Sequence, residues 1–200
     1  LRGAAPAGAA DLRPQSGSFM NAAPRTSLPP QPPPQPQRLQ GLAPVVSAAT
    51  VVLILGSFPG ARSLATGQYY AHPQNHFWRI LQAVWPGVAL PVDSYEDRLA
   101  WLLARGLGLW DVYASCDRQG SLDTSIRNAQ ANDFAALARG LPRLVAVAHN
   151  GGESFKHARH VSALGLPVHQ LPSSSPANAS WRFERKLVAW RDVFATHGLV

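Results

Sequence analysis

The residues best suited to chemistry lie together in one short stretch, YYAHPQNHFW, which runs from Tyr69 to Trp78. It combines aromatic rings, imidazoles and one uncharged amide, Asn75, directly before an amphipathic segment typical of a helix. A ring in a loop can stack on a planar heterocycle, and an amide can orient a water molecule. Asn75 is equally suited to capping the helix, where its side-chain oxygen would accept a backbone N–H.

Other chemistries find little support in the residue pattern. His72 and His76 have a spacing that can bind zinc on a helix, but Pro73 lies between them and no further ligand follows in the loop. Cys116 is the only cysteine, which excludes an internal disulfide and favours the interpretation of a small hydrophobic residue. No GxGxxG, GK[ST] or G-x-S-x-G motif is present. We therefore expect neither a metal nor another cofactor.

Strands and helices alternate along the chain, which predicts an α/β/α sandwich. Continuous apolar runs at 50–56, 107–113, 143–150 and 166–171 are typical of the strands of a parallel sheet. Helices are predicted from about residue 75 and over 93–106, 132–140 (capped by Asn132), 151–165 and 181–194. The segments 57–74 and 114–131 are predicted to be loops.

Composition divides the chain into a Pro/Ala-rich tail, residues 1–44, which we expect to be disordered, and one folded domain, residues 45–200. The whole chain carries a net charge of +7, and the domain carries fourteen Lys and Arg against ten Asp and Glu, or +4. That excess suits a polyanion such as DNA. No run reaches the ~18 apolar residues of a membrane span. We expect a monomer in the cytoplasm, acting on the DNA of a bacterial nucleoid.

Ligands of such sheets bind beyond the carboxyl ends of the strands. The candidate residues there are Gly56, Ser57, Phe58, Pro59 and Gly60 after the first strand, Asp111, Asp123 and Ser125 after the second, Asn150 after the third, and Ser173, Ser174, Ser175, Pro176, Ala177 and Asn178 after the fourth. The small hydroxyl and amide groups of the last set precede a helix, an arrangement that suits a phosphate and equally suits simple capping.

The ordered set GSFPG, QYYAHPQNHFW, GLWDVYASCDRQGSLDTSIR, VAHNGG and LPSSSPAN resembles the uracil-DNA glycosylase superfamily, and within it the hypoxanthine-DNA glycosylase branch. The resemblance covers essentially the whole domain from Val51 to the last helix. It implies a four-stranded parallel sheet and hydrolysis of the N-glycosidic bond of a deaminated base, which is flipped out of DNA.

The resemblance also implies roles for individual residues. Gly56 to Gly60, with His72 and Asn150, would line the base pocket, and Tyr70 would stack on the base. Asn75 would hold the attacking water. Ser173 to Asn178 would grip the DNA backbone and insert into the duplex, and Asp111, Asp123 and Ser125 are further candidates for the rim.

Two features depart from the superfamily pattern. Phe58 stands where many members carry an Asp or Asn that positions the water, and the insertion segment offers only Pro176 and Ala177 as a wedge. A weak wedge favours bases that are already mismatched, because these cost less to unstack.

A uracil- or mismatch-specific glycosylase of the same superfamily is one alternative, and two interpretations without glycosylase activity also remain. The chain could be a DNA-binding module without catalysis, or an unrelated α/β enzyme acting on small molecules, for which no salt-dependent DNA affinity is expected.

Overall fold

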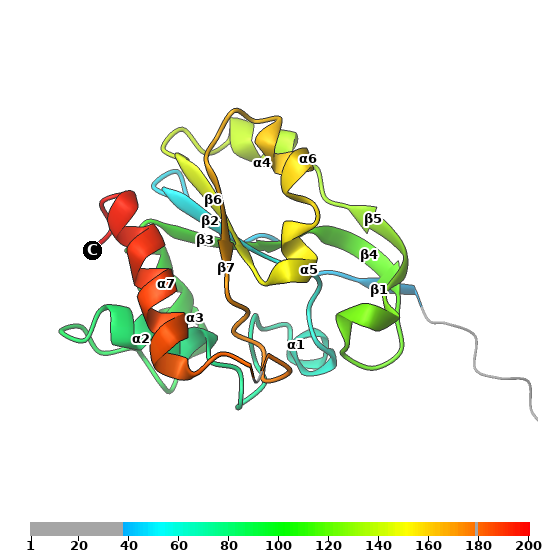
Figure 1. The fold of residues 1–200 in the computed structure, drawn as a ribbon, viewed down its shortest axis with the longest axis horizontal. Coiled ribbons are helices and arrows are strands. Elements are labelled where there is room, and N and C mark those ends of the chain that lie inside the picture. The colour runs from blue at the N-terminus through cyan, green and yellow to red at the C-terminus, as the bar shows by residue number, and fades with distance from the viewer. Residues whose placement is uncertain (1–37, 179) are drawn as a thin grey trace, which may run out of the picture. The chain divides into compact units, whose positions relative to one another are not determined.

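Four short apolar segments form a parallel sheet at the centre of residues 38–178 and 180–200, the part of the chain that the computed structural model describes (Figure 1). The strands are β2 (Val52–Gly56), β3 (Leu107–Asp111), β6 (Ala146–Asn150) and β7 (Val168–Leu171), in the order β3-β2-β6-β7. Every neighbouring pair is parallel, which confirms the predicted four-stranded sheet. β2 is buried along its whole length, which explains its unbroken apolar sequence.

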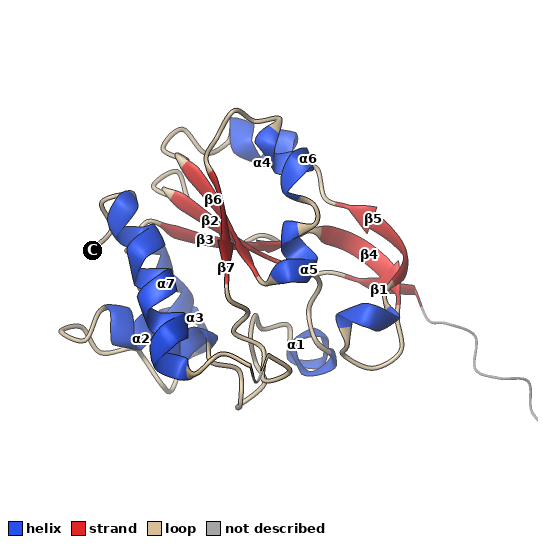
Figure 2. Ribbon diagram, in the orientation of Figure 1, coloured by secondary structure: helices blue, strands red, loops and turns tan. Residues whose placement is uncertain are grey.

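Helices cover both faces of this sheet and give the predicted three layers (Figure 2). Val52 and Ile54 of β2 face a core that includes α2 (Phe77–Val84), α3 (Tyr95–Leu103) and α7 (Phe183–Thr196). Leu53 and Leu55 face the opposite core, which includes α4 (Phe134–Arg139) and α6 (Ala158–Ser162). The alternation of side chains along a strand therefore splits one apolar run between two cores.

A second sheet was not expected from the sequence. It consists of three antiparallel strands, β1 (Arg38–Gln40), β4 (Tyr113–Asp117) and β5 (Arg127–Ala131), in the order β1-β4-β5. The prediction of a loop over 114–131 was wrong for both β4 and β5, which are separated by a short 3₁₀ turn (Asp123–Ser125). Every residue of β5 is exposed, so the segment lacks the apolar alternation by which a strand is recognised.

The folded part begins earlier than predicted, because β1 falls within the segment assigned to the tail. Arg38 fixes this strand by donating to Ser115 Oγ at 2.7 Å, and its guanidinium lies 3.7 Å from Asp117. The expectation of disorder for residues 1–37 concerns positions outside the described residues.

Three helical predictions also differ from the structure. A short helix, α1 (Ala61–Thr66), lies within the predicted loop 57–74. The helix expected over 151–165 is divided into α5 (Gly152–Phe155) and α6, and His157 between them bonds the Tyr113 hydroxyl at 2.6 Å. The residue that caps α4 is Asp133, which accepts from the Ala136 N–H, whereas Asn132 donates to the Asp111 carbonyl.

Among the described residues, no helix has both the length and the apolar character that crossing a bilayer requires.

Candidate active site

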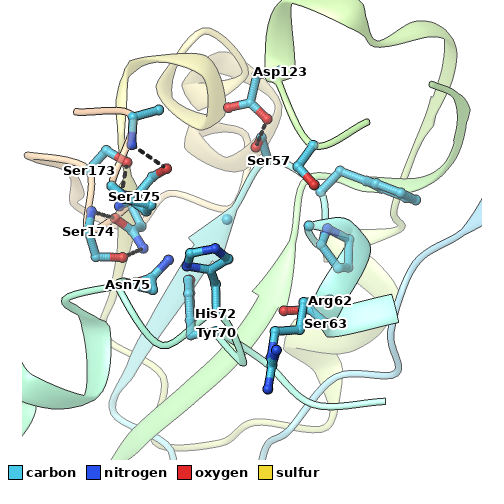
Figure 3. A pocket seen from close by; sticks show the side chains of 18 of the residues that line it. Ser57, Arg62, Ser63, Tyr70, His72, Asn75, Asp123, Ser173, Ser174 and Ser175 are labelled. Atoms are coloured by element: carbon cyan, nitrogen blue, oxygen red, sulfur yellow. Dashed lines mark hydrogen bonds between the residues drawn. The ribbon is translucent and has the colours of Figure 1, made fainter. Parts of the chain in front are cut away.

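A cavity of about 340 Å³ opens at the carboxyl ends of the parallel strands (Figure 3), within the size range of small-molecule sites. We call it the rim cavity. The sequence-predicted residues that line it are Gly56, Ser57, Phe58, Pro59, Gly60, Tyr70, His72, Asn75, Asp111, Asp123, Asn150, Ser173, Ser174, Ser175, Pro176 and Ala177. Segments far apart in the sequence therefore meet in one place, as the sheet topology predicts.

Asn75 lies one residue before His76, the N-cap of α2, and its side chain both contacts the first turn of the helix and lines the cavity. Its Oδ1 accepts the Phe77 N–H at 3.0 Å, so the side-chain oxygen is committed to the helix. This contact leaves the Asn75 Nδ2 group for the cavity, where Figure 3 shows it beside His72. The capping and catalytic interpretations of Asn75 are therefore compatible, because they use different atoms of one amide.

Tyr70 presents an aromatic ring to the cavity from a strained backbone. Its φ of 54° lies in the left-handed region, which costs a non-glycine residue on the order of 1–3 kcal/mol. The ring stacks on Phe77 with centroids 3.8 Å apart and planes 15° apart. One face of Tyr70 is therefore covered by the core, and the residue also lines the cavity. Burial raises the pKa of its hydroxyl, which has no hydrogen-bond partner among the described residues.

Asp111 is a buried carboxyl group at the cavity end of β3. Its side chain is only 4 % exposed, and Oδ2 lacks a hydrogen-bond partner in the described part of the chain. Burial raises the pKa of Asp111 to about 7, and the nearby Asp123 acts in the same direction. Gly56 makes room for this carboxyl group, because any Cβ at that position would collide with Asp111 Oδ1.

The loop after β2, residues 56–60, is held in place from the second sheet. Arg118 donates to the Pro59 carbonyl, and its guanidinium lies 4.9 Å from the centre of the Phe58 ring. Ser57 Oγ donates to Asp123 at 2.7 Å. The Ser57 and Phe58 N–H groups have no acceptor among residues 38–178 and 180–200, so both are available to a ligand.

The loop after β7 is tied to β6 by a reciprocal pair of hydrogen bonds. Asn150 Nδ2 donates to Ser174 Oγ, and Asn150 Oδ1 accepts the Ser174 N–H, each at 2.8 Å. The Ser174 carbonyl in turn accepts the His76 N–H at 2.9 Å, next to the start of α2. Gly151, with φ 109°, allows Ser173 to approach so closely that a Cβ would lie 2.9 Å from it. This network fixes residues 173–178, which we call the serine loop, beside Asn75.

Two predicted residues do not line the cavity. Ser125 uses its hydroxyl within its own turn, where it donates to the carbonyls of Gln119 and Leu122. Asn178 donates to the Ser173 carbonyl and lines a neighbouring hollow instead. Asn150 lines the cavity, but both its amide nitrogen and its amide oxygen bond Ser174.

Sequence reasoning missed residues that α1 and β4 contribute. Arg62 and Ser63 of α1 line the cavity, and Ser63 Oγ accepts the Ala71 N–H at 3.3 Å. Arg118 is 4 % exposed although it is charged, and only its place after β4 explains how it reaches the loop after β2. The signal that could have found Arg118 is its place directly after β4, but this segment was predicted to be a loop.

The chemistry of the rim cavity is that of a desolvated hydrogen-bonding site. No set of three or more His, Cys, Asp or Glu side chains in the described residues is arranged to hold a metal ion. The cavity instead offers the Tyr70 ring, a carboxyl group with a raised pKa, the unbonded N–H groups of the lining residues Ser57 and Phe58, and the Asn75 amide. Such a set can recognise a planar heterocycle by its edge and its face.

Comparisons with known proteins agree with this geometry. A family model described as the uracil DNA glycosylase superfamily matches residues 43–194. A relative called hypoxanthine DNA glycosylase from Methanosarcina barkeri is 39 % identical over 155 residues, 78 % of this chain and 97 % of the relative. A relative of the same name from Methanosarcina acetivorans is 35 % identical over 156 residues, with the same coverage.

A solved structure shows the same similarity in three dimensions. It is the solution NMR structure of a protein from Methanosarcina acetivorans that was proposed to be a uracil DNA glycosylase. The two structures have a TM-score of 0.71 at 34 % sequence identity, over 80 % of this chain and 98 % of that one.

Proposed function

Since this chain belongs to the uracil DNA glycosylase superfamily, we propose that it is a monofunctional DNA glycosylase that removes hypoxanthine from DNA. It hydrolyses the N-glycosidic bond of the deaminated base, the first step of base-excision repair, and leaves an abasic site. The observation that supports a deaminated base is the buried, unpartnered Asp111 carboxyl group in the rim cavity. The choice of hypoxanthine among the deaminated bases follows the two relatives called hypoxanthine DNA glycosylase.

Asp111 suits the edge of hypoxanthine. That edge presents a donor, N1–H, beside an acceptor, O6, and a protonated carboxyl group presents an acceptor beside a donor. The two groups can therefore form paired hydrogen bonds, and the free N–H groups of Ser57 and Phe58 can serve other acceptors of the base. The face of the base would stack on Tyr70, whose other face lies on Phe77.

Bond cleavage sends an electron pair from the C1′–N9 bond onto the base, so negative charge develops on the leaving group. A neutral Asp111 stabilises this charge by donating a hydrogen bond, whereas an ionised Asp111 would repel it. The raised pKa of Asp111, about 7, supports the neutral form at and below neutral pH.

Asn75 supports the second half of the reaction. Its Nδ2 donates to the oxygen of one water molecule and so holds it near C1′, while Oδ1 stays on the Phe77 N–H. The water attacks the cationic sugar, and its proton passes to the departing basic nitrogen. Because the departing base takes the proton, a neutral amide suffices in this path.

The serine loop supports binding of the DNA backbone. Residues 173–177 line the cavity, and Asn150 and the His76 N–H hold Ser174 in place. Pro176 and Ala177 are exposed there. We propose that they contact the gap left by the flipped nucleotide, without a bulky wedge.

We further propose that the protein acts as a monomer in the cytoplasm. Its only cysteine, Cys116, is free and buried, which is consistent with a reducing compartment. The base is recognised by residues of a single chain.

The test is to incubate the purified protein with labelled duplexes that carry one hypoxanthine, one uracil or one xanthine, followed by alkali cleavage. We expect a cut at hypoxanthine. A cut at uracil alone would keep the superfamily activity and overturn the choice of base. Binding without any cut would establish the non-catalytic module instead.

A further inference from the structure

A second hollow adjoins the rim cavity on the outer side of the serine loop, between the N-terminal ends of α2 and α7. Ser175 and Pro176 line both hollows, so the loop forms a shared wall. Figure 1 shows α2 and α7 packed side by side next to this loop. The other lining residues are Pro73, Gln74, His76, Arg79, Asn178, Trp181, Arg182, Phe183 and Lys186. We call this site the cationic hollow.

Its lining contains three basic side chains, Arg79, Arg182 and Lys186, and no Asp or Glu. None of these three takes part in an ion pair with any acid of the described residues. Cations on a protein surface normally stand among acids of opposite sign, as Lys156 does beside Glu153. The hollow therefore has an excess of positive charge that the protein itself does not neutralise.

Lys186 is the most unusual of the three because it is only 1 % exposed. A fully buried lysine normally has a charged partner. Lys186 Nζ donates only to the Asn178 carbonyl, at 3.0 Å, although an ammonium group has three hydrogens to donate. Burial lowers its pKa, so an anion in the hollow would stabilise its charged form.

Arg79 and His76 are held on the ring of Phe183. The Arg79 guanidinium lies 4.1 Å from the ring centre, and the His76 ring meets Phe183 edge-on at 5.6 Å. A stacked guanidinium keeps its N–H edge free for an oxygen ligand. His76 Nδ1 is buried without a partner in the described part of the chain, and burial, Lys186 and Arg79 all lower the pKa of this imidazole.

The N-terminus of α7 adds backbone donors on the same side. This helix has 14 residues, and its N-cap, Arg182, makes no side-chain capping bond. Free N–H groups and the helix dipole at such an end attract anions. Glu184 belongs to the first turn of α7 but does not line the hollow.

We propose that the cationic hollow binds a backbone phosphate of the DNA strand beside the flipped nucleotide. The ligand is assigned to DNA because the hollow shares Ser175 and Pro176 with the cavity that would hold the base. A strand whose nucleotide enters the rim cavity passes over this wall, and its next phosphates reach Arg79, Arg182 and Lys186. The inference rests on the proposed function for its ligand, but its test needs only binding.

The test compares the double variant Arg79→Gln, Arg182→Gln with the matched control Arg139→Gln, which removes a charge from an exposed residue at the end of α4. Duplex affinity is measured over a series of salt concentrations. We expect the double variant to weaken binding at low salt and to reduce the slope of log K against log salt by about 0.9 for each phosphate that the protein no longer neutralises. The control should move neither quantity as much.

A second set of duplexes identifies the phosphate. Each carries one uncharged methylphosphonate linkage near the hypoxanthine, and one position should weaken binding to the wild type but not to the double variant. Lys186→Met is a third variant, used after a melting curve has established that it folds.

Equal salt slopes in the double variant and the control would overturn the inference. A second result would also overturn it: inorganic phosphate raises the melting temperature of the wild type only, and no methylphosphonate position weakens duplex binding. The hollow would then hold a free phosphate ion and not a DNA phosphate. Neither result depends on excision, so the failure of the proposed function, which is the absence of any cut, is recognised separately.

Discussion

The rim cavity and the cationic hollow share the serine loop as a wall but differ in their charged residues. The cavity lining includes two acids, Asp111 and Asp123, as well as Arg62, whereas the charged residues of the hollow are all basic and lie around Phe183 and Trp181. One site suits an uncharged planar base, and the other suits a charged phosphate. We propose that the enzyme recognises the base in the rim cavity and the backbone phosphate in the cationic hollow.

The comparison shows how each site accommodates an ionisable side chain that is buried without a partner of opposite charge. Asp111 is buried without a cation in contact and responds by a raised pKa, so it can become a neutral donor. Lys186 is buried without an acid in contact, and burial lowers its pKa, so a phosphate in the hollow would favour its charged form. In both cases a buried polar group keeps hydrogen-bonding capacity that the described residues do not use, and we propose that the ligand uses it.

The largest effect is expected when the Asn75 amide is removed, which tests whether the rim cavity controls rate and not affinity. We expect Asn75→Ala to lower the single-turnover excision rate by a factor on the order of 10²–10⁴, while the duplex Kd changes little. Asn75→Ser is the control, because serine can still accept the Phe77 N–H but does not reach the cavity. An Asn75→Ser variant as active as the wild type would reduce Asn75 to a helix cap.

The pH dependence of excision tests whether Asp111 acts as a neutral, protonated acid. The proposed reaction requires Asp111 in its protonated form, so the wild-type rate should be highest below pH 7 and fall as the pH rises through about 7. Asp111→Asn, which is neutral at every pH and offers one donor and one acceptor, should flatten this profile. Asp111→Ala should lose most activity at all pH values. A wild-type rate that rises through pH 7 would contradict this account.

The pH dependence of stability in the wild type and Asp111→Asn provides an independent check on the pKa of Asp111. The folded-state pKa of Asp111 is raised above its ordinary value of 3.8 to about 7, so its burial costs nothing in acid and costs most above pH 7. The wild type should therefore lose on the order of 3 kcal/mol of unfolding free energy relative to Asp111→Asn between about pH 4 and pH 8. Melting curves across this range measure the difference, and parallel curves would mean that Asp111 titrates normally.

A smaller effect is expected at Tyr70. Tyr70→Ala should weaken retention of the flipped base by about 1–3 kcal/mol, the value of one stacked ring. Tyr70→Phe keeps the ring on Phe77 and removes a hydroxyl group that has no partner within the described chain, so it should bind DNA as the wild type does. Kd for a hypoxanthine duplex measures both variants, and equal losses would shift the role from the ring to the hydroxyl group.

The smallest expected effect is at Ser57. Ser57→Ala removes the hydrogen bond to Asp123 and should cost about 1 kcal/mol of stability. Because Ser57 lines only the rim cavity, the salt dependence of binding should stay at the wild-type slope. A changed slope would show that the two sites are less separate than their linings indicate.

The parts predictable from sequence were those with strong local patterns. The four parallel strands are unbroken apolar runs, and parallel topology alone brings their carboxyl ends to one edge. This is why most of the predicted candidates line one cavity. The exposed strand β5 and the bend at His157 have no such pattern, because each depends on a partner distant in sequence.

Two details could not be predicted either: that Asn75 uses Oδ1 for the Phe77 N–H and leaves Nδ2 for the cavity, and that Lys186 is buried. On an amphipathic helix, Lys186 would be expected to face solvent. In the structure it is buried, and its Nζ donates to the carbonyl of Asn178 in the serine loop. A hydrogen-bonding pattern of this kind depends on fractions of an ångström, which residue type and spacing do not encode.

The most direct test of the division between the two sites measures two quantities on the same two variants. For Asn75→Ala and for the double variant Arg79→Gln, Arg182→Gln, we would determine the excision rate at saturating enzyme and the duplex Kd. The account predicts that Asn75→Ala loses rate and keeps affinity, and that the double variant loses affinity and recovers most of its rate at saturation. Parallel losses of rate and affinity in both variants would contradict it.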